Sequence, residues 1–260
     1  MESEGLFIRR SAAERYRKGR PFYHPQVVRR IKDFLALERP LERAVDIGCG
    51  TGLSSVALAD IAREVVGVDR SAAMIACAEA APRVRYCQAA AERLPIRDAA
   101  ADLVTFGSAW HWMDRRPLLG QARRILRPGG WLVVYDNAFS ARMAENPDFQ
   151  NWMQSVFRVD FPAPPRNRME ISETDAVREG FALRKKEAYQ NDVKLTVRSL
   201  VDYLMTLSNI IAAVEGGGRP AEDVDRWLME KVIPFYGSRA ESTFPFGGEI
   251  WCFQKIEKQE

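Results

Sequence analysis

The sequence predicts an α/β fold of the doubly wound class, in which helices cover both faces of a mostly parallel, seven-stranded sheet and an insertion precedes the last strands. Two observations predict it. Short runs of β-branched residues alternate with helical stretches between residues 43 and 135, which is typical of repeated strand–helix–strand units. The first of these strands also runs directly into a glycine-rich turn that opens a helix.

The first strand–helix–strand unit has strands at 44–47 and 65–68. Between them Leu53, Val56 and Ile61 recur at helical spacing, so a helix can bury this stripe against the sheet. One complete crossover is therefore expected here, and it should be right-handed.

Three further strands are expected at 84–86, 102–106 and 131–135. Ser71 is a suitable N-cap for a helix that runs toward Pro82, before the third strand. A helix with apolar residues at 118–126 ends at the Pro-Gly-Gly that precedes the fifth strand. Five strands with four crossovers can thus be read from the sequence.

The regular alternation ends after Asn137, and we expect three segments. These are an amino-terminal lid and core at 1–136, a largely helical substrate cap with one strand at 137–248, and a final strand and tail at 249–260. Within the cap, we expect a strand at 193–195 and helices at 197–207 and 222–232, and the last strand should pair with 183–189. The apolar residues of the cap predict a partly apolar chamber, with Phe149, Trp152, Met153, Phe157, Leu204 and Ile210 among its lining.

Composition excludes several classes of protein. The net charge of +3 is too small to indicate a nucleic-acid partner. No run of about 18 apolar residues indicates a membrane span, and charges interrupt the first ten residues where a signal peptide would need an apolar core. The four cysteines form no C-x-x-C pair and only two histidines accompany them. We therefore expect a cytoplasmic, metal-free protein with a small-molecule substrate; a homodimer is left open.

The glycine-rich turn spans 45–52, Val-Asp-Ile-Gly-Cys-Gly-Thr-Gly. Glycines allow the backbone angles of a tight turn and let a ligand approach the main chain. A dinucleotide fingerprint would need glycine at Leu53, and a phosphate-binding P-loop would need Gly-Lys-Ser or Gly-Lys-Thr where Gly52 is followed by Leu53 and Ser54. Asp46 would repel a pyrophosphate and attract an ammonium or sulfonium, so the turn favours a cationic cofactor.

Asp69 ends the second strand, 21 residues beyond Gly48. A carboxylate at this edge can accept hydrogen bonds from both ribose hydroxyls and would repel the additional phosphate of NADP. An adenosine with free hydroxyls is therefore expected.

Four segments in this order, 46–52, Asp69, 90–95 and 126–130, resemble the motifs of class I S-adenosylmethionine-dependent methyltransferases, which have a Rossmann-like fold. The resemblance covers roughly residues 15–136. Within that superfamily, 17–25 and 110–114 resemble the small-molecule branch, the type 11 proteins that include trans-aconitate methyltransferase-like proteins.

The resemblance implies the roles of several residues in binding S-adenosylmethionine. The backbone of Gly48, Cys49 and Gly50 and the carboxylate of Asp46 would hold the methionine part. Asp69 would hold the ribose. The remaining contacts, toward the adenine, would come from Arg70, Met74, Ala91 and Glu92.

Ala90 departs from the family pattern, since many relatives have an aspartate there, and backbone groups would have to replace its contact with the adenine amino group. After the fourth strand, Ser108 and His111 complete the predicted cofactor set. In the amino-terminal segment, Tyr16 and Arg20 are the candidates for a lid, with Arg20 pairing with the cofactor's carboxylate; a solvated basic face is the alternative.

His111 is the one candidate catalytic base, because it follows the fourth strand and stands between two tryptophans; a histidine packed between these aromatic side chains is the alternative. Trp110, Trp112 and Tyr23 are candidate substrate contacts, with core packing as the alternative for the tryptophans. Cys49 is interpreted as a small residue that fits the turn, not as a nucleophile. Which arginine would hold an acidic substrate is left open among Arg115, Arg116, Arg158, Arg166 and Arg168.

These observations predict methyl transfer from S-adenosylmethionine to an oxygen, nitrogen or carbon of a small molecule. The cofactor carries the activation, so no catalytic triad is needed. Three alternatives remain: a non-catalytic S-adenosylmethionine-binding protein, an RNA or DNA methyltransferase, and a nicotinamide-dependent oxidoreductase. The second is disfavoured because Gly-Ser-Ala-Trp stands at 107–110, after the fourth strand, instead of an Asn-Pro-Pro-type tetrapeptide, and Leu53 disfavours the third.

Overall fold

The computed structural model describes residues 6–110, 113, 115–164 and 173–256 of the chain. They form two compact units. We call one the sheet unit, which comprises Phe22–Asp136, Arg166–Tyr189 and Gly248–Glu260, and the other the helical unit, which comprises Met1–Pro21, Asn137–Pro165 and Gln190–Gly247. This grouping differs from the predicted boundaries, because the amino-terminal segment belongs with the helical unit and part of the predicted cap belongs with the sheet unit.

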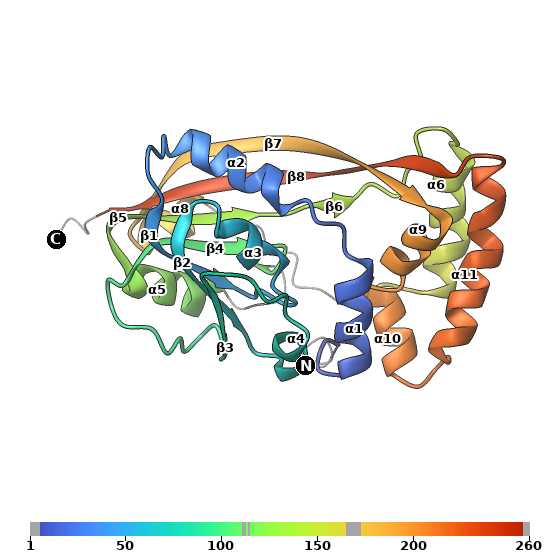
Figure 1. Ribbon diagram of the computed structural model, residues 1–260, viewed down its shortest axis with the longest axis horizontal. Helices are drawn as coiled ribbons and strands as arrows, with labels where there is room; N and C mark the ends of the chain where they lie inside the picture. The colour runs from blue at the N-terminus through green and yellow to red at the C-terminus, as the bar shows by residue number, and fades with distance from the viewer. Residues whose placement is uncertain (1–5, 111–112, 114, 165–172, 257–260) are drawn as a thin grey trace. The chain divides into compact units, whose positions relative to one another are not determined.

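Within the described residues the sheet has eight strands, in the order β3-β2-β1-β4-β5-β8-β6, and β7 pairs with β8 (Figure 1). The strands are β1 Leu41–Ile47, β2 Ala62–Asp69, β3 Val84–Gln88, β4 Ala101–Gly107, β5 Leu126–Tyr135, β6 Ala138–Phe139, β7 Phe181–Thr196 and β8 Glu241–Lys255. The first five pair in parallel, and β8 pairs antiparallel with β5. The predicted fold class is confirmed; the strand count exceeds the prediction by one because the two-residue β6 also pairs with β8.

The helices of the sheet unit are α2 His24–Phe34, α3 Leu53–Leu58, α4 Ala72–Ala76, α5 Arg115–Ile125 and α8 Glu173–Arg178. Two apolar clusters show that helices cover both faces. Val45 and Ile47 pack in one cluster with residues of α5, whereas Ala44 and Val65 pack in the other with residues of α2 and α3. Because side chains alternate along a strand, Asp46 lies on the face of α2 and α3.

The helical unit contains α1 Arg10–Gly19, α6 Asp148–Trp152, the π-helical turn η3 Met153–Phe157, α7 Arg158–Asp160, α9 Val197–Leu204, α10 Ser208–Glu215 and α11 Ala221–Tyr236. Gly19 lies against α9 so closely that an added Cβ would stand 2.1 Å from the carbonyl oxygen of Asp202. Glu215 accepts from Arg15 at 2.6 Å and from Ser11 at 2.9 Å. Close packing and a partly buried ion pair thus hold α1 within this unit.

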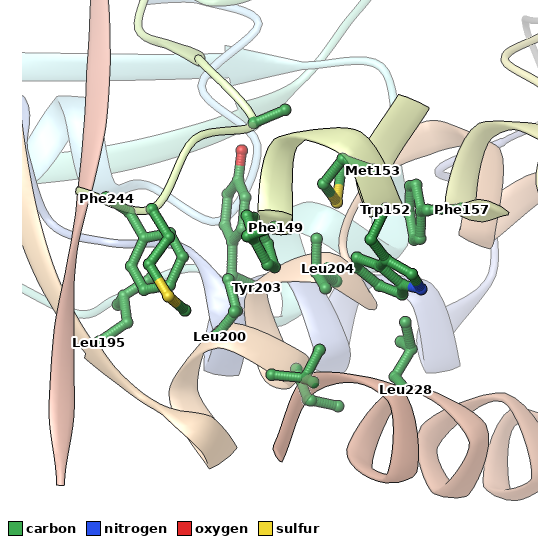
Figure 2. Packing of buried hydrophobic residues seen from close by; sticks show 14 of the residues in the cluster. Phe149, Trp152, Met153, Phe157, Leu195, Leu200, Tyr203, Leu204, Leu228 and Phe244 are labelled. Carbon is green, nitrogen blue, oxygen red and sulfur yellow. The ribbon is translucent and has the colours of Figure 1, made fainter. Parts of the chain in front are cut away.

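The core of the helical unit is rich in aromatic side chains (Figure 2). Trp152 lies 5.7 Å from Phe157 and 6.0 Å from Trp227, between ring centroids. The six residues expected to line a chamber are all buried members of this cluster. That expectation is wrong for these side chains, because burying their apolar surface against one another stabilises the unit instead.

Several predicted elements are confirmed with different ends. The helix that begins after Ser71 stops at Ala76, well before Pro82, and Ser71 Oγ caps it by accepting from the Met74 amide at 3.2 Å. The two strand segments expected around 183–189 and 193–195 form one strand, β7, and its pairing with β8 confirms the predicted partner of the last strand. The helix expected at 197–207 ends at Leu204.

Over the described residues, no single helix combines the length and hydropathy needed to cross a bilayer. The pair α9 and α10 passes that test only when joined, and its two helices are bent by 68°.

Candidate cofactor site

The glycine-rich turn joins β1 to α3 at the carboxyl edge of the sheet. Gly48, Gly50 and Gly52 have φ angles of 72°, 54° and 84°, a region that strongly favours glycine. The amides of Gly48 and Cys49 both donate to the carbonyl of Val68, at 2.8 and 3.1 Å. The turn is therefore anchored to β2, next to the strand end that carries the ribose-binding candidate.

Two of these glycines also meet a steric requirement inside the protein. A Cβ on Gly48 would stand 2.5 Å from the Cβ of Ala109 and 2.8 Å from Cε of Met113, and one on Gly52 would stand 2.1 Å from the Tyr86 hydroxyl. Sequence reasoning assigned these glycines to the backbone angles of the turn and to ligand approach. Packing of the turn against the segment after β4 and against β3 is a further reason for them.

Asp46 is fully buried beneath the turn. Its Oδ2 accepts from Ser54 Oγ at 2.5 Å and Ser55 Oγ at 2.7 Å, and its Oδ1 accepts from Thr105 Oγ1 at 2.8 Å. Burial raises the pKa of this carboxyl, against the lowering effect of the hydroxyls. The carboxylate thus joins β1, α3 and β4, a structural role that sequence reasoning missed; its contact with the methionine part of the cofactor stays a prediction.

Asp69 ends β2 and is half-buried. Its Oδ2 accepts from the amide of Gly50 at 2.9 Å and its Oδ1 from the amide of Ser71 at 2.8 Å. Burial raises its pKa, while these amides and the nearby Arg70 lower it. Since a carboxylate has about four acceptor positions, these backbone donors leave it able to accept from a ribose hydroxyl as well.

The adenine-side candidates lie near Asp69. The amide of Ala89 donates to the Asp69 carbonyl at 3.0 Å, which brings the following segment to the same edge. There Ala91 is buried and Glu92 is exposed, while in the segment after Asp69 Arg70 is exposed and Met74, on α4, is buried. The structure therefore places an apolar and a polar group on each of the two segments that would flank an adenine.

Cys49 is a buried thiol inside the turn. Burial raises its pKa well above the ordinary value, and the carboxylates of Asp46 and Asp69 raise it further. A thiol that holds its proton is a poor nucleophile, which agrees with its interpretation as a small residue that fits the turn.

Ser108 follows β4 with a φ of 54°. Its hydroxyl donates to Asp136 Oδ1 at 2.9 Å and lies 2.9 Å from the Tyr23 hydroxyl. Beside this group, Nδ1 of the buried His24 lies 2.9 Å from the Tyr135 hydroxyl. Of these residues, sequence reasoning named Ser108 and Tyr23 but not the others; an aspartate directly after β5 was the signal that could have pointed to Asp136.

Trp110 is buried in the core of the sheet unit, with its ring 4.9 Å from Phe106 in an edge-on arrangement. This position agrees with the core-packing alternative for Trp110. Because the ring is buried, the structure gives no support to its predicted contact with substrate. His111 and Trp112 lie outside the described residues, as do Arg166 and Arg168. Their predicted roles stay predictions.

Tyr16 and Arg20 belong to the helical unit. The Arg20 guanidinium lies 4.6 Å above the Tyr16 ring and 5.4 Å from the Tyr203 ring, and it donates to the Thr206 carbonyl at 3.2 Å. Within this unit Arg20 is held against α9 instead of forming part of a solvated basic face. Its pairing with the cofactor stays a prediction.

The residues of the sheet unit fit S-adenosylmethionine. The turn is free of side chains at its glycines, and Thr51 Oγ1 within it is buried without a hydrogen-bond partner in the described structure. Asp69 holds acceptor capacity at the predicted ribose position. The turn lies at the carboxyl ends of β1 and β2, with β4 next to β1, which is where doubly wound sheets bind ligands.

Comparisons with known proteins also indicate a methyltransferase. Residues 45–134 match the family described as "Methyltransferase domain". The chain is 34% identical over 206 residues to an uncharacterized methyltransferase of Mycobacterium tuberculosis, covering 78% of this chain and 77% of that protein. It is 39% identical over 110 residues to a trans-aconitate 2-methyltransferase of Deinococcus radiodurans, which is 40% of this chain and 42% of that one.

The fold is shared with solved structures. One, described as a proposed type II methyltransferase from Anaeromyxobacter dehalogenans, has a TM-score of 0.70 at 22% identity and covers 92% of this chain and 99% of its own. The sequence relatives lead to one conclusion about the family. The chain belongs to the methyltransferase family and is a class I enzyme that depends on S-adenosylmethionine.

Proposed function

We propose that the acceptor of this methyltransferase is a small molecule and that the enzyme acts in the cytoplasm. The similarity to a trans-aconitate 2-methyltransferase supports a small acceptor. The net charge of +3 supports it as well, because nucleic-acid enzymes need a concentrated basic face.

The observation that carries the proposed chemistry is the bridge from Asp69 to the turn through Gly50. This hydrogen bond holds a carboxylate and the glycine backbone of the turn in position to bind one ligand. S-adenosylmethionine supplies a methyl group already activated by its sulfonium charge. The chain has to orient the cofactor through Asp69 and the backbone of Gly48 to Gly50, align the acceptor, and exclude water.

Calorimetry with S-adenosylmethionine, S-adenosylhomocysteine, NAD and ATP tests the cofactor site. We expect the first two ligands to saturate the protein and NAD and ATP to give no heat of binding. Methyl-labelled cofactor is then offered with tRNA, with DNA and with small metabolites. Label found only in the last group supports the proposal, and label in either nucleic acid contradicts it.

His111 is the candidate base that the sequence predicts; it lies outside the described residues, and its role stays a prediction. His111→Ala should lower turnover while cofactor affinity stays unchanged, if the acceptor must lose a proton to this side chain. Full turnover in the variant would contradict that role. A carboxylate acceptor is already anionic at neutral pH and would make the substitution silent.

A further inference from the structure

Three side chains of the sheet unit form a directed chain of hydrogen bonds. Ser108 Oγ donates to Asp136 Oδ1 at 2.9 Å, and Tyr23 Oη lies 2.9 Å from Ser108 Oγ. A serine hydroxyl has one proton to donate. Because Ser108 gives it to Asp136, Tyr23 donates to Ser108, and the chain runs from a buried phenol to an exposed carboxylate.

This chain lies next to the candidate cofactor site. Gly107 pairs with Tyr135, so Ser108 and Asp136 follow neighbouring strand ends. Neighbouring strands are about 4.8 Å apart, and β4 also pairs with β1, which ends at the glycine turn. The close approach of Ala109 to Gly48 confirms that the segment after β4 touches that turn. The acceptor must meet the cofactor at this edge of the sheet.

The backbone around the chain is held in place. Ser108 adopts a φ of 54° although it is not glycine, a conformation that costs energy and persists where the surroundings impose it. Its amide donates to the Tyr135 carbonyl at 2.8 Å. The Tyr189 hydroxyl donates to the Asp136 carbonyl at 2.6 Å. Tyr23 stacks on His24 with ring centroids 4.1 Å apart.

We propose that Tyr23, Ser108 and Asp136 bind the nucleophilic group of the methyl acceptor, and that this group is a hydroxyl or an amine. The proposal rests on the proposed function and deepens it. A hydroxyl or amine can donate to the oxygens of this chain. A carboxylate acceptor would bring a second negative charge toward Asp136, and like charges repel.

The same chain, in place of the base predicted at His111, takes the proton that such an acceptor must lose. The acceptor oxygen or nitrogen forms a bond to the methyl carbon, the carbon–sulfur bond breaks, and its electron pair stays on sulfur. The acceptor proton passes to Ser108 Oγ while the serine proton passes to Asp136. Because Asp136 is exposed, it exchanges this proton with water.

The test depends on the chemistry of the product, so the acceptor need not be known. The protein is incubated with methyl-labelled S-adenosylmethionine and the low-molecular-weight fraction of a cell extract, and the labelled product is treated with mild alkali. Methyl esters release labelled methanol, whereas methyl ethers and methylamines are stable. We expect alkali-stable label. Labelled methanol would overturn the inference and leave the proposed function standing, while the absence of any label would count against the proposed function.

Variants then test the three side chains. Asp136→Asn and Ser108→Ala should lower the rate of alkali-stable labelling at least tenfold, and Asp136→Asn should keep the affinity for S-adenosylhomocysteine within twofold of wild type. Tyr23→Phe should have a smaller effect, because Ser108 and Asp136 remain. Asp60→Asn, at an exposed carboxylate beyond α3, is the matched control, and its labelling rate should equal that of wild type.

The pH profile separates proton transfer from a structural role. In Asp136→Asn the remaining rate should rise with pH, because the acceptor must then lose its proton to solvent. An Asp136→Asn protein with wild-type labelling, or with a reduced rate and an unchanged pH profile, would overturn the proposal.

Discussion

The amide of Gly50 donates to Oδ2 of Asp69 at 2.9 Å. This bond joins the glycine turn after β1 to the acid that ends β2, so the two features that identified the cofactor from the sequence form one structure. Oδ1 of the same carboxylate holds the amide of Ser71, and the start of α4 is fixed along with them. Changes at Asp69 should therefore affect both the ligand and the turn.

Asp69→Asn should weaken S-adenosylhomocysteine binding roughly 10- to 100-fold, or about 1.4–2.7 kcal/mol. The amide has only one oxygen, so either a backbone donor or a ribose hydroxyl loses its acceptor. Calorimetry measures the affinity, and Asp60→Asn is the matched control. Unchanged affinity in Asp69→Asn would place the ribose elsewhere.

Gly52→Ala should destabilise the protein more than Gly129→Ala does. Both glycines have positive φ, 84° and 72°, but only at Gly52 would a Cβ meet another group, the Tyr86 hydroxyl at 2.1 Å. We expect about 1–2 kcal/mol for the backbone strain alone at Gly129 and about 1–3 kcal/mol more at Gly52 for overpacking. Urea unfolding measures both. Equal losses would show that the tyrosine moves aside without cost.

Asp46→Asn should remove a pH dependence of stability. Burial raises the pKa of Asp46 in the folded protein, so the folded state binds this proton more tightly than the unfolded state does. The resulting stabilisation is fully present below about pH 3.9, the ordinary aspartate pKa, and is lost as pH rises through the folded pKa. Unfolding free energies from pH 4 to pH 8 should therefore fall more steeply for wild type than for Asp46→Asn. Parallel curves would contradict this.

Glu215→Gln should loosen α1 within the helical unit. Glu215 and Arg15 are 2.6 Å apart, with side chains only 10% and 17% exposed, and Ser11 also donates to this carboxylate. We expect a loss of about 1–3 kcal/mol and faster tryptic cleavage within α1. Glu14→Gln, whose partner Arg10 is exposed, is the control and should cost less than about 0.5 kcal/mol. Equal cleavage of both variants would show that packing around Gly19 alone holds the helix.

The regions that were predicted well are those with a strong local signal. The five parallel strands and the turn between β1 and α3 depend on β-branched runs and on glycines, and both act over a few residues. Helix ends were predicted less well, as α4 shows: it stops at Ala76, although no breaker stands before Pro82. Its last turn competes with tertiary hydrogen bonds, such as that from the Glu79 amide to the Thr51 carbonyl at 2.9 Å, which a local pattern does not reveal.

The candidate site shows the same difference between local and long-range features. Asp69 and the glycines could be singled out from the sequence because their spacing along the chain is set by one strand–helix–strand unit. The partners of Asp46 and the group formed by Tyr23, Ser108 and Asp136 were not found. The members of that group are separated by 85 and 28 positions, and only strand order brings them together.

The sequence by itself therefore determined the fold class and the cofactor, and it predicted an acid at the ribose position, because these follow from local periodicity and from residue types at fixed spacing. The tertiary structure alone decided that Asp46 is a buried acceptor of three hydroxyls, that α1 packs with α9 and α10, and that the aromatic residues after position 148 form a core. The physical reason is that burial and long-range hydrogen bonds depend on which strands and helices become neighbours, and this is settled only when the whole chain folds.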